Sequence, residues 1–302
     1  MEPRELLRGV VDLHVHAGPS FAKRNVDAAE MLLEAENRGY RCFVIKDHNF
    51  PTVMSAKLVE KHIGKGITKP IGAIVLNSMV GGWTLKAVST TVEMGGRMVF
   101  CPTLSSPNHI DKTNRPGALP FRAAGKSSVP DRPVKTVDPD GKLLPEVVEI
   151  LEYLAGQPQV CIGTGHLDAP EVDQIIREAV KRGCKNIVVN HPYYLVDATM
   201  DDMKRWVDMG AYMEVNACVS LPYSRHNCID FKGLAEIMEK IGPDHCIVSS
   251  DFGALGNYFP VDGLGMFLEL LGKEIHVSEE ELAIMSKVNP AKLIHLDDIP
   301  PA

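Results

Sequence analysis

Two histidines separated by one residue, His14 and His16, end an apolar run near the start of the chain (GVVDLHVH, residues 9–16). Alternate side chains of a strand point to the same face, so both imidazoles would lie on one side and Val15 on the other. Two imidazoles on one face can bind a single divalent ion, and a carboxylate can complete such a site. Asp12 would share this face one step deeper, where its carboxylate could orient one of the rings.

Polar residues that suit metal chemistry also end several later apolar runs. His48 closes a run that carries Lys46 and Asp47 before it, and His166, His191, Asn216 and Asp251 each close a further run. A lone HxH pair is a weak indicator of a metal site. Its repetition at the ends of other runs favours one, because the ends of parallel strands in a barrel meet at one mouth.

The elements that would position these residues are eight short β-rich runs, at residues 9–16, 41–48, 71–77, 97–103, 160–166, 186–192, 211–217 and 245–251. Near-continuous apolar runs are typical of parallel strands that are buried on both faces. Amphipathic segments separate them, and capping boxes predict helix starts at Asp27, Asp168 and Ser278. We therefore expect an α/β protein with a single-domain (β/α)₈ TIM barrel over residues 1–302. A doubly wound sheet would alternate in the same way, but no glycine-rich phosphate loop follows any run.

One segment, residues 104–144, interrupts this alternation with many Pro, Gly, Ser and basic residues. It follows the fourth run, so in a barrel it would lie over the mouth, and we predict that it is a lid-like insertion. Arg115 and Arg122 in this segment are candidate binding residues for an anionic substrate, although a solvated loop surface is the simpler interpretation for them and for His109.

Composition excludes several classes of protein. A net charge of -7 argues against nucleic-acid binding, which usually requires a basic face. No apolar run reaches membrane-spanning length, and no signal peptide is predicted, so we expect a cytoplasmic protein without a membrane partner. The seven cysteines are odd in number and lie partly in apolar runs, which favours reduced, buried thiols. Homo-oligomerisation stays open.

The residues at the strand ends resemble those of the amidohydrolase superfamily of metal-dependent hydrolases. The similarity extends to NPAKLIHL (289–296), which resembles a helix start near the C-termini of that superfamily. DLHVHAGPS and IKDHNFPT are similar to the HxHAGP and KDH motifs of the uncharacterised DUF6282 group. The resemblance implies metal ligation by His14, His16, His166, His191 and Asp251, with Asp251 also acting as the base for a water activated by the metal.

The sequence departs from the superfamily pattern after the fourth run. Binuclear members carry a carboxylated lysine or a glutamate there, whereas this chain reads CPTLSS. Lys46 and His48 are additional, and IKDHN resembles a motif of the polymerase-and-histidinol-phosphatase family, in which His48 would be a further ligand. Both side chains could face the mouth while Asp47 points away.

These observations predict a hydrolase that uses one or two divalent ions, with zinc favoured and manganese, iron or nickel open. The substrate would be a small amide, ester or lactone. Lys46 would hold an anionic group of this small molecule, and Asn216 would donate a hydrogen bond to it. A phosphoesterase, a metal-dependent decarboxylase and a non-catalytic metal-binding barrel remain alternatives.

Overall fold

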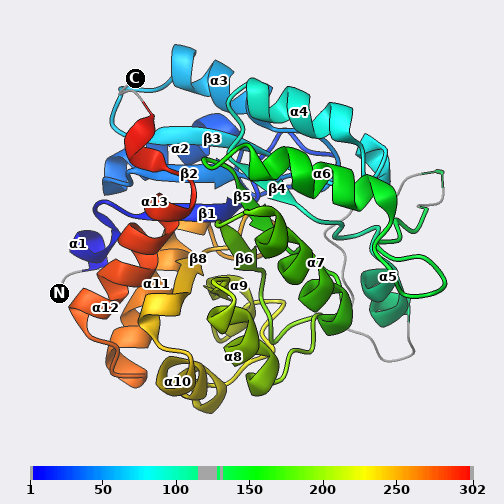
Figure 1. Ribbon diagram of the computed structural model, residues 1–302. Helices are drawn as coiled ribbons and strands as arrows, with labels where there is room; N and C mark the ends of the chain where they lie inside the picture. Colours follow the sequence, from blue (N-terminus) through cyan, green and yellow to red (C-terminus); the bar gives the residue numbers. More distant parts are fainter. Residues whose placement is uncertain (1–2, 115–127, 130–131, 300–302) are drawn as a thin grey trace.

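The computed structural model describes residues 3–114, 128–129 and 132–299, and it contains eight parallel strands that follow sequence order around a barrel (Figure 1). The strands are β1 (Val11–Val15), β2 (Cys42–Ile45), β3 (Lys69–Val75), β4 (Met98–Phe100), β5 (Cys161–Gly163), β6 (Ile187–Val189), β7 (Tyr212–Asn216) and β8 (Cys246–Ser249). Each of the eight predicted runs overlaps one strand, and β3 begins two residues before its run. The (β/α)₈ prediction is therefore confirmed.

Helices surround the strands on the outside of the barrel (Figure 1). The helices are α1 (Pro3–Leu7), α2 (Ala28–Arg38), α3 (Val53–His62), α4 (Leu85–Glu93), α5 (Pro107–Asn114), α6 (Pro145–Ala155), α7 (Ala169–Arg182), α8 (Met200–Asp208), α9 (Ala217–Ser220), α10 (Phe231–Lys240), α11 (Pro260–Glu274), α12 (Glu279–Ala283) and α13 (Asn289–Leu293). Capping boxes at Asp27, Asp168 and Ser278 begin α2, α7 and α12, as the sequence predicts.

Backbone hydrogen bonds just beyond β8 join it to β1. The amide of Asp251 donates to the carbonyl of His14 at 2.8 Å, and the amide of His16 donates to the carbonyl of Phe252 at 2.9 Å. These two bonds place the segment after β8 directly against the two histidines of the HxH motif. A contact between residues more than 200 positions apart is thereby fixed by the main chain.

The lower half of the barrel interior is apolar. Inward side chains such as Val11, Leu13 and Phe100 form one buried cluster, which α13 seals with Ala291 and Leu293. A plug of this kind fills the space between the strands, so polar side chains are confined to the mouth above it. The C-terminal NPAK motif thus closes the end of the barrel opposite the candidate site.

A shift of register in β1 corrects one expectation. The pairing of β1 with β2 is irregular between Asp12 and Val15. Leu13 and His14 therefore both turn toward the interior, and Asp12 does not share the face of the histidines. Asp12 accepts hydrogen bonds from the amides of His14 and Ser250 instead, so the prediction that it orients an imidazole is wrong.

Other expectations concern cysteines, membranes and the 104–144 segment. All seven cysteines are free, and six of them are buried, as predicted. No helix in the described part of the chain is long and apolar enough to cross a membrane.

Within the 104–144 segment, α5 is hydrogen-bonded to the loops after β5 and β6, because Asn108 donates to the carbonyls of His166 and Leu195. Closure of this segment as a lid stays a prediction.

Candidate metal centre

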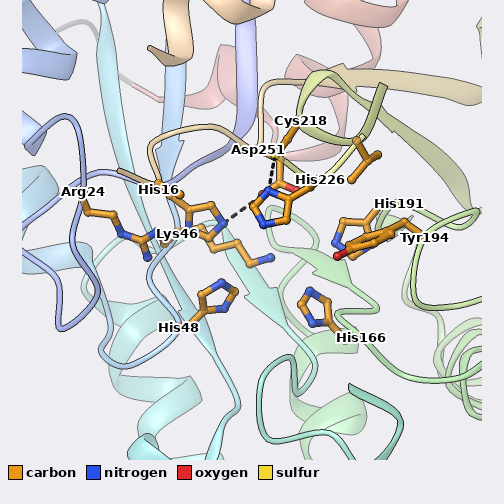
Figure 2. A pocket seen from close by; sticks show the side chains of 12 residues that line it. His16, Arg24, Lys46, His48, His166, His191, Tyr194, Cys218, His226 and Asp251 are labelled. Carbon is orange, nitrogen blue, oxygen red and sulfur yellow. Dashed lines mark hydrogen bonds and ion pairs between the residues drawn. The ribbon is translucent and has the colours of Figure 1, made fainter. Parts of the chain in front are cut away.

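Five histidines from four strand ends form a closed circle of imidazoles at the mouth of the barrel. Neighbouring ring centroids lie 5.2 Å apart for His14 and His16, 4.8 Å for His16 and His48, and 6.1 Å for His48 and His166. His191 completes the circle, 5.0 Å from His166 and 6.1 Å from His14. All five are buried, and Figure 2 shows four of them facing one chamber.

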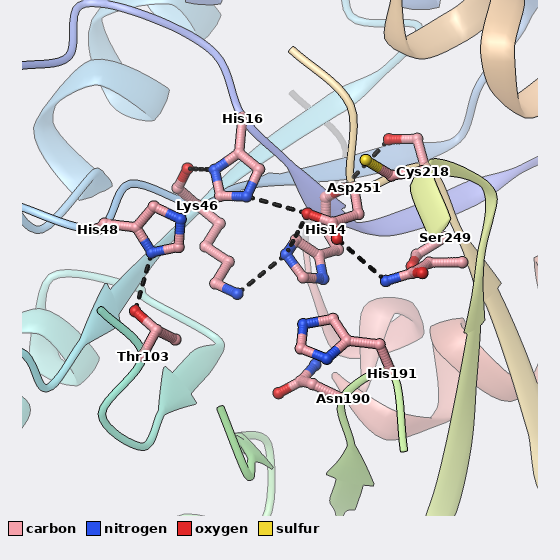
Figure 3. A network of polar contacts seen from close by, with 12 residues as sticks. His14, His16, Lys46, His48, Thr103, Asn190, His191, Cys218, Ser249 and Asp251 are labelled. Carbon is pink, nitrogen blue, oxygen red and sulfur yellow. Dashed lines mark hydrogen bonds and ion pairs between the residues drawn. The ribbon is translucent and has the colours of Figure 1, made fainter. Parts of the chain in front are cut away.

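The tightest group of potential ligands consists of His14, His16 and Asp251, each of which offers one atom within 4.8 Å of the others. Asp251 Oδ1 lies 3.0 Å from His14 Nε2 and 3.1 Å from His16 Nε2 (Figure 3). Asp251 adopts a positive φ of 51°, a conformation that aspartate tolerates better than most residues. This backbone turn occurs where the chain must aim the carboxylate at both rings.

Hydrogen bonds at the opposite nitrogens fix the tautomers of both rings. His16 Nδ1 lies 3.0 Å from the carbonyl oxygen of Lys46, which can only accept, so Nδ1 carries a proton. His14 Nδ1 likewise donates to Glu214 Oε1 at 2.8 Å. In the neutral rings both Nε2 atoms then present lone pairs to the lone pairs of Asp251, an arrangement that a positive charge at this point stabilises. The donor set therefore fits a divalent ion.

Glu214 was not anticipated from the sequence, yet it is the buried carboxylate that organises the site. Besides His14, it accepts hydrogen bonds from Ser249 Oγ at 2.8 Å, Asn190 Nδ2 at 3.0 Å and the amide of His191 at 3.2 Å. Burial opposes its ionisation, but the neighbouring His14 ring and its hydrogen bond lower the pKa of Glu214 to about 2. Its position two residues before Asn216 on β7 is the feature that could have revealed an inward carboxylate.

Protonation of the rings follows from burial and from these carboxylates. Burial lowers the pKa of His16 to about 3 and that of His191 to about 4, so both are neutral at pH 7. Burial also opposes the charged form of His14, but Asp251 and Glu214 outweigh it and raise the pKa of His14 to about 9. Without a metal, a proton on His14 supplies the positive charge that the lone pairs of Asp251 require.

Lys46 and His48 both line the chamber, while Asp47 turns to hydrogen-bond Ser20 and the amides of Asn49 and Phe50. The ammonium of Lys46 lies 2.9 Å from His14 Nε2 and 4.5 Å from the centre of the Phe100 ring. Burial lowers the pKa of Lys46 to about 8. Lys46 is thus a buried cation above the apolar plug.

Two of the other three histidines in the circle are held by hydrogen bonds at Nδ1. His48 Nδ1 pairs with Thr103 Oγ1 at 2.9 Å, and His166 Nδ1 pairs with His109 Nδ1 at 2.8 Å. His109 lies on α5, is buried and contacts His166. The interpretation of His109 as a solvated loop residue is therefore wrong. His191 has a positive φ of 30°, and its buried Nδ1 has no hydrogen-bond partner among the described residues.

The remaining predicted binding residues are placed differently from the histidines. Asn216 is not among the residues that line the chamber. Its Nδ2 donates to Asp251 Oδ2 at 3.2 Å, so it orients that carboxylate. Arg115 and Arg122 lie outside the described residues. Five histidines, Arg24, Lys46 and Asp251 line the chamber together with residues that include Tyr194 and Val219, and its free volume is about 30 Å³.

Comparison with known proteins places this site in context. The family DUF6282, described as a family of unknown function, matches residues 9–214. No curated protein matches the chain. Similar solved structures include 2,6-dihydroxybenzoate decarboxylase from Rhizobium, at 11% identity and a TM-score of 0.57 over 96% of this chain and 99% of that chain.

A dihydroorotase is similar at 16% identity and a TM-score of 0.52, over 96% of this chain and 70% of that chain. An enamidase described as a member of the amidohydrolase superfamily is similar at 13% identity and a TM-score of 0.55, over 95% of this chain and 67% of that chain. Identities this low establish a shared barrel fold and leave substrate and reaction open. The family match spans more than half of the sequence, and on that evidence the chain belongs to the DUF6282 family.

Proposed function

We propose that this protein is a metal-dependent hydrolase that attacks a small amide, ester or lactone with an activated water. The observation that carries the proposal is the convergence of His14 Nε2, His16 Nε2 and Asp251 Oδ1 with both rings locked in the ligating tautomer. Zinc is the favoured ion because it accepts nitrogen and carboxylate ligands together. His166, His191 and His48 are candidates to hold a second ion or to bind the substrate.

When bound, the divalent ion would supply Lewis acidity, which acidifies water and polarises a carbonyl or phosphoryl oxygen. Asp251 lies at the mouth with its side chain 14% exposed, so it can receive a proton from the attacking water and return it to the leaving group. Asn216 holds the second oxygen of Asp251 during both transfers. The ammonium of Lys46 would stabilise negative charge that develops on the substrate.

The chamber wall favours hydrolysis over the decarboxylase alternative. A decarboxylase for aromatic acids would require a largely apolar pocket, whereas Arg24, Lys46 and Asp251 place three charged groups in this wall beside the histidines. The phosphoesterase alternative requires His48 as a ligand, and His48 does face the chamber. Phosphoester cleavage therefore predicts that removal of His48 releases a metal ion, whereas hydrolysis of a carbonyl substrate does not require this.

A turnover assay tests the proposal. Zinc-loaded protein is incubated with panels of esters, lactones, amides, phosphoesters and aromatic acids, and product acids and carbon dioxide are measured. We expect hydrolysis of at least one carbonyl substrate, its loss after chelation, its return with zinc, and a fall of about 100-fold or more in Asp251→Asn. Hydrolysis that survives chelation, carbon dioxide release alone, or no turnover by a zinc-loaded protein would contradict the proposal.

A further inference from the structure

Arg24, in the loop between β1 and α2, also reaches the chamber, although no sequence pattern singles it out. Its side chain is only 4% exposed, and it lines the same cavity as His16, Lys46 and Asp251. Figure 2 shows its guanidinium directed toward that cavity. A buried arginine at the mouth is costly unless its charge and its donors are matched.

Within the described residues, Arg24 has too few acceptors for its charge and its N–H donors. Its one ion pair is long, because Nη2 lies 3.4 Å from Asp47 Oδ2. The same carboxylate already accepts from Ser20, Asn49 and Phe50. The Nε donor of Arg24 is buried and has no hydrogen-bond partner among the described residues. Burial accordingly lowers the pKa of Arg24, even though Asp47 and Asp251 oppose the shift.

The main chain around Arg24 is held firmly against the segment that follows Asp251. Arg24 forms an isolated antiparallel bridge with Ala254, and the amide of Asn25 donates to the carbonyl of Gly253 at 3.0 Å. The side-chain amide of Asn25 adds bonds to the carbonyls of Asn257 and Tyr258. The guanidinium is therefore fixed relative to Asp251, as a substrate-positioning group must be.

Charge at the chamber points the same way. The carboxylates of Asp251 and Glu214 are each committed to histidines and their neighbours, and Asp47 is committed to its loop. Among the residues that line the chamber, Arg24 and Lys46 are basic and Asp251 is acidic. An anionic substrate would restore the balance and would supply the acceptors that Arg24 lacks.

We propose that Arg24 binds a carboxylate group of the substrate and so makes the enzyme selective for small carbonyl compounds that carry a free acid. The proposal rests on the hydrolase assignment and adds the substrate class to it. A planar two-oxygen group suits a guanidinium that still has unmatched donors in one plane. Lys46 would remain free to face the reacting carbonyl.

Binding of matched probes tests this role without requiring turnover. Benzoate and its neutral counterpart benzamide are titrated by calorimetry into the protein, once as zinc-loaded enzyme and once after chelation, and phenylphosphonate serves as a third probe. We expect benzoate to bind wild type at least about tenfold more tightly than benzamide does. Arg24→Gln should lose that preference while benzamide binding is unchanged, and Arg24→Lys should keep part of it.

The matched control is Arg225→Gln, which removes an arginine whose Nη1 bonds the carbonyl of Leu255 outside the chamber wall. It should leave benzoate binding as in wild type. Thermal melts establish that each variant folds, and Arg24→Met is a second variant should Arg24→Gln fail to fold. Unchanged benzoate binding in a folded Arg24 variant, or a tenfold preference for phenylphosphonate, would overturn the carboxylate assignment.

The failure of this inference is distinguishable from the failure of the hydrolase proposal. A protein that hydrolyses carbonyl substrates but binds benzoate independently of Arg24 contradicts the carboxylate subsite alone. A protein that never binds zinc contradicts the hydrolase, yet the dependence of benzoate binding on Arg24 is still read in the chelated sample.

Discussion

Replacement of Glu214 by glutamine probes how the second layer of the site controls the metal ligands. The carboxylate accepts four hydrogen bonds, from His14, Asn190, His191 and Ser249. An amide of the same shape keeps one acceptor oxygen and puts a donor against the remaining N–H or O–H groups. With two buried donors left unmatched at about 1–3 kcal/mol each, we expect the free energy of unfolding to fall by about 2–6 kcal/mol.

Metal affinity should fall as well, for a reason separate from stability. An amide N–H that faces His14 Nδ1 favours the tautomer with its proton on Nε2, the atom that would ligate the ion. Loss of such an orienting partner typically costs 10- to 100-fold in metal affinity, or about 1.4–2.7 kcal/mol. Competition with a chromophoric chelator measures the zinc affinity, and urea unfolding measures the stability.

Glu36→Gln is the matched control for this experiment. Glu36 is also buried and accepts two backbone amides, from Lys65 and Ile67, but it lies outside the barrel mouth. Both amides donate to Oε1, so a glutamine can keep its oxygen there, and this variant should leave zinc affinity unchanged. The reasoning is refuted if Glu214→Gln binds zinc within about twofold of wild type, since the tautomer of His14 would then not depend on Glu214.

Three further predictions follow from the same contacts. Without metal the pKa of His14 is raised to about 9, so zinc must displace a proton from this ring below that pH. The apparent zinc affinity should therefore rise about tenfold per pH unit up to about pH 9 and then level off. A zinc affinity that does not change between about pH 7 and pH 9 would contradict this prediction. Gly253→Ala should lower stability by about 3 kcal/mol and weaken zinc binding, because the added Cβ would lie 1.7 Å from the carbonyl oxygen of His16 at a φ of +123°; Gly272→Ala, whose nearest neighbour would be 3.7 Å away, is the tolerated control. Lys46→Met should fold and keep its metal while hydrolysis falls about 100-fold or more, since the ammonium is not a ligand; metal analysis that shows a lost ion would instead make Lys46 part of the metal site.

Much of the fold could be predicted because it depends on local patterns. Eight apolar runs predict eight parallel strands, and the capping boxes predict the starts of α2, α7 and α12. The histidines at the strand ends could be grouped because the geometry of a barrel brings such ends together. The periodicity of the strands thus predicts which residues meet, without any knowledge of their contacts.

The supporting contacts were harder to predict because they join residues far apart in sequence. Glu214 lies 200 positions from His14, and His109 lies 57 positions from His166. Arg24 comes from a loop whose path is set by backbone bonds to the segment after Asp251. The face of Asp12 was predicted wrongly because a shift of register in β1 breaks the alternation of side chains.

Metal content is the measurement that tests the central claim most directly. Plasma mass spectrometry of purified wild type supplied with zinc should find at least one divalent ion per chain, and the ion bound by His14, His16 and Asp251 should be lost in His14→Ala and Asp251→Ala. His62→Ala, on the exposed end of α3, should retain it. Absence of metal from wild type after zinc and manganese are both supplied, or full retention in the His14 and Asp251 variants, would contradict a metal-dependent site at this mouth.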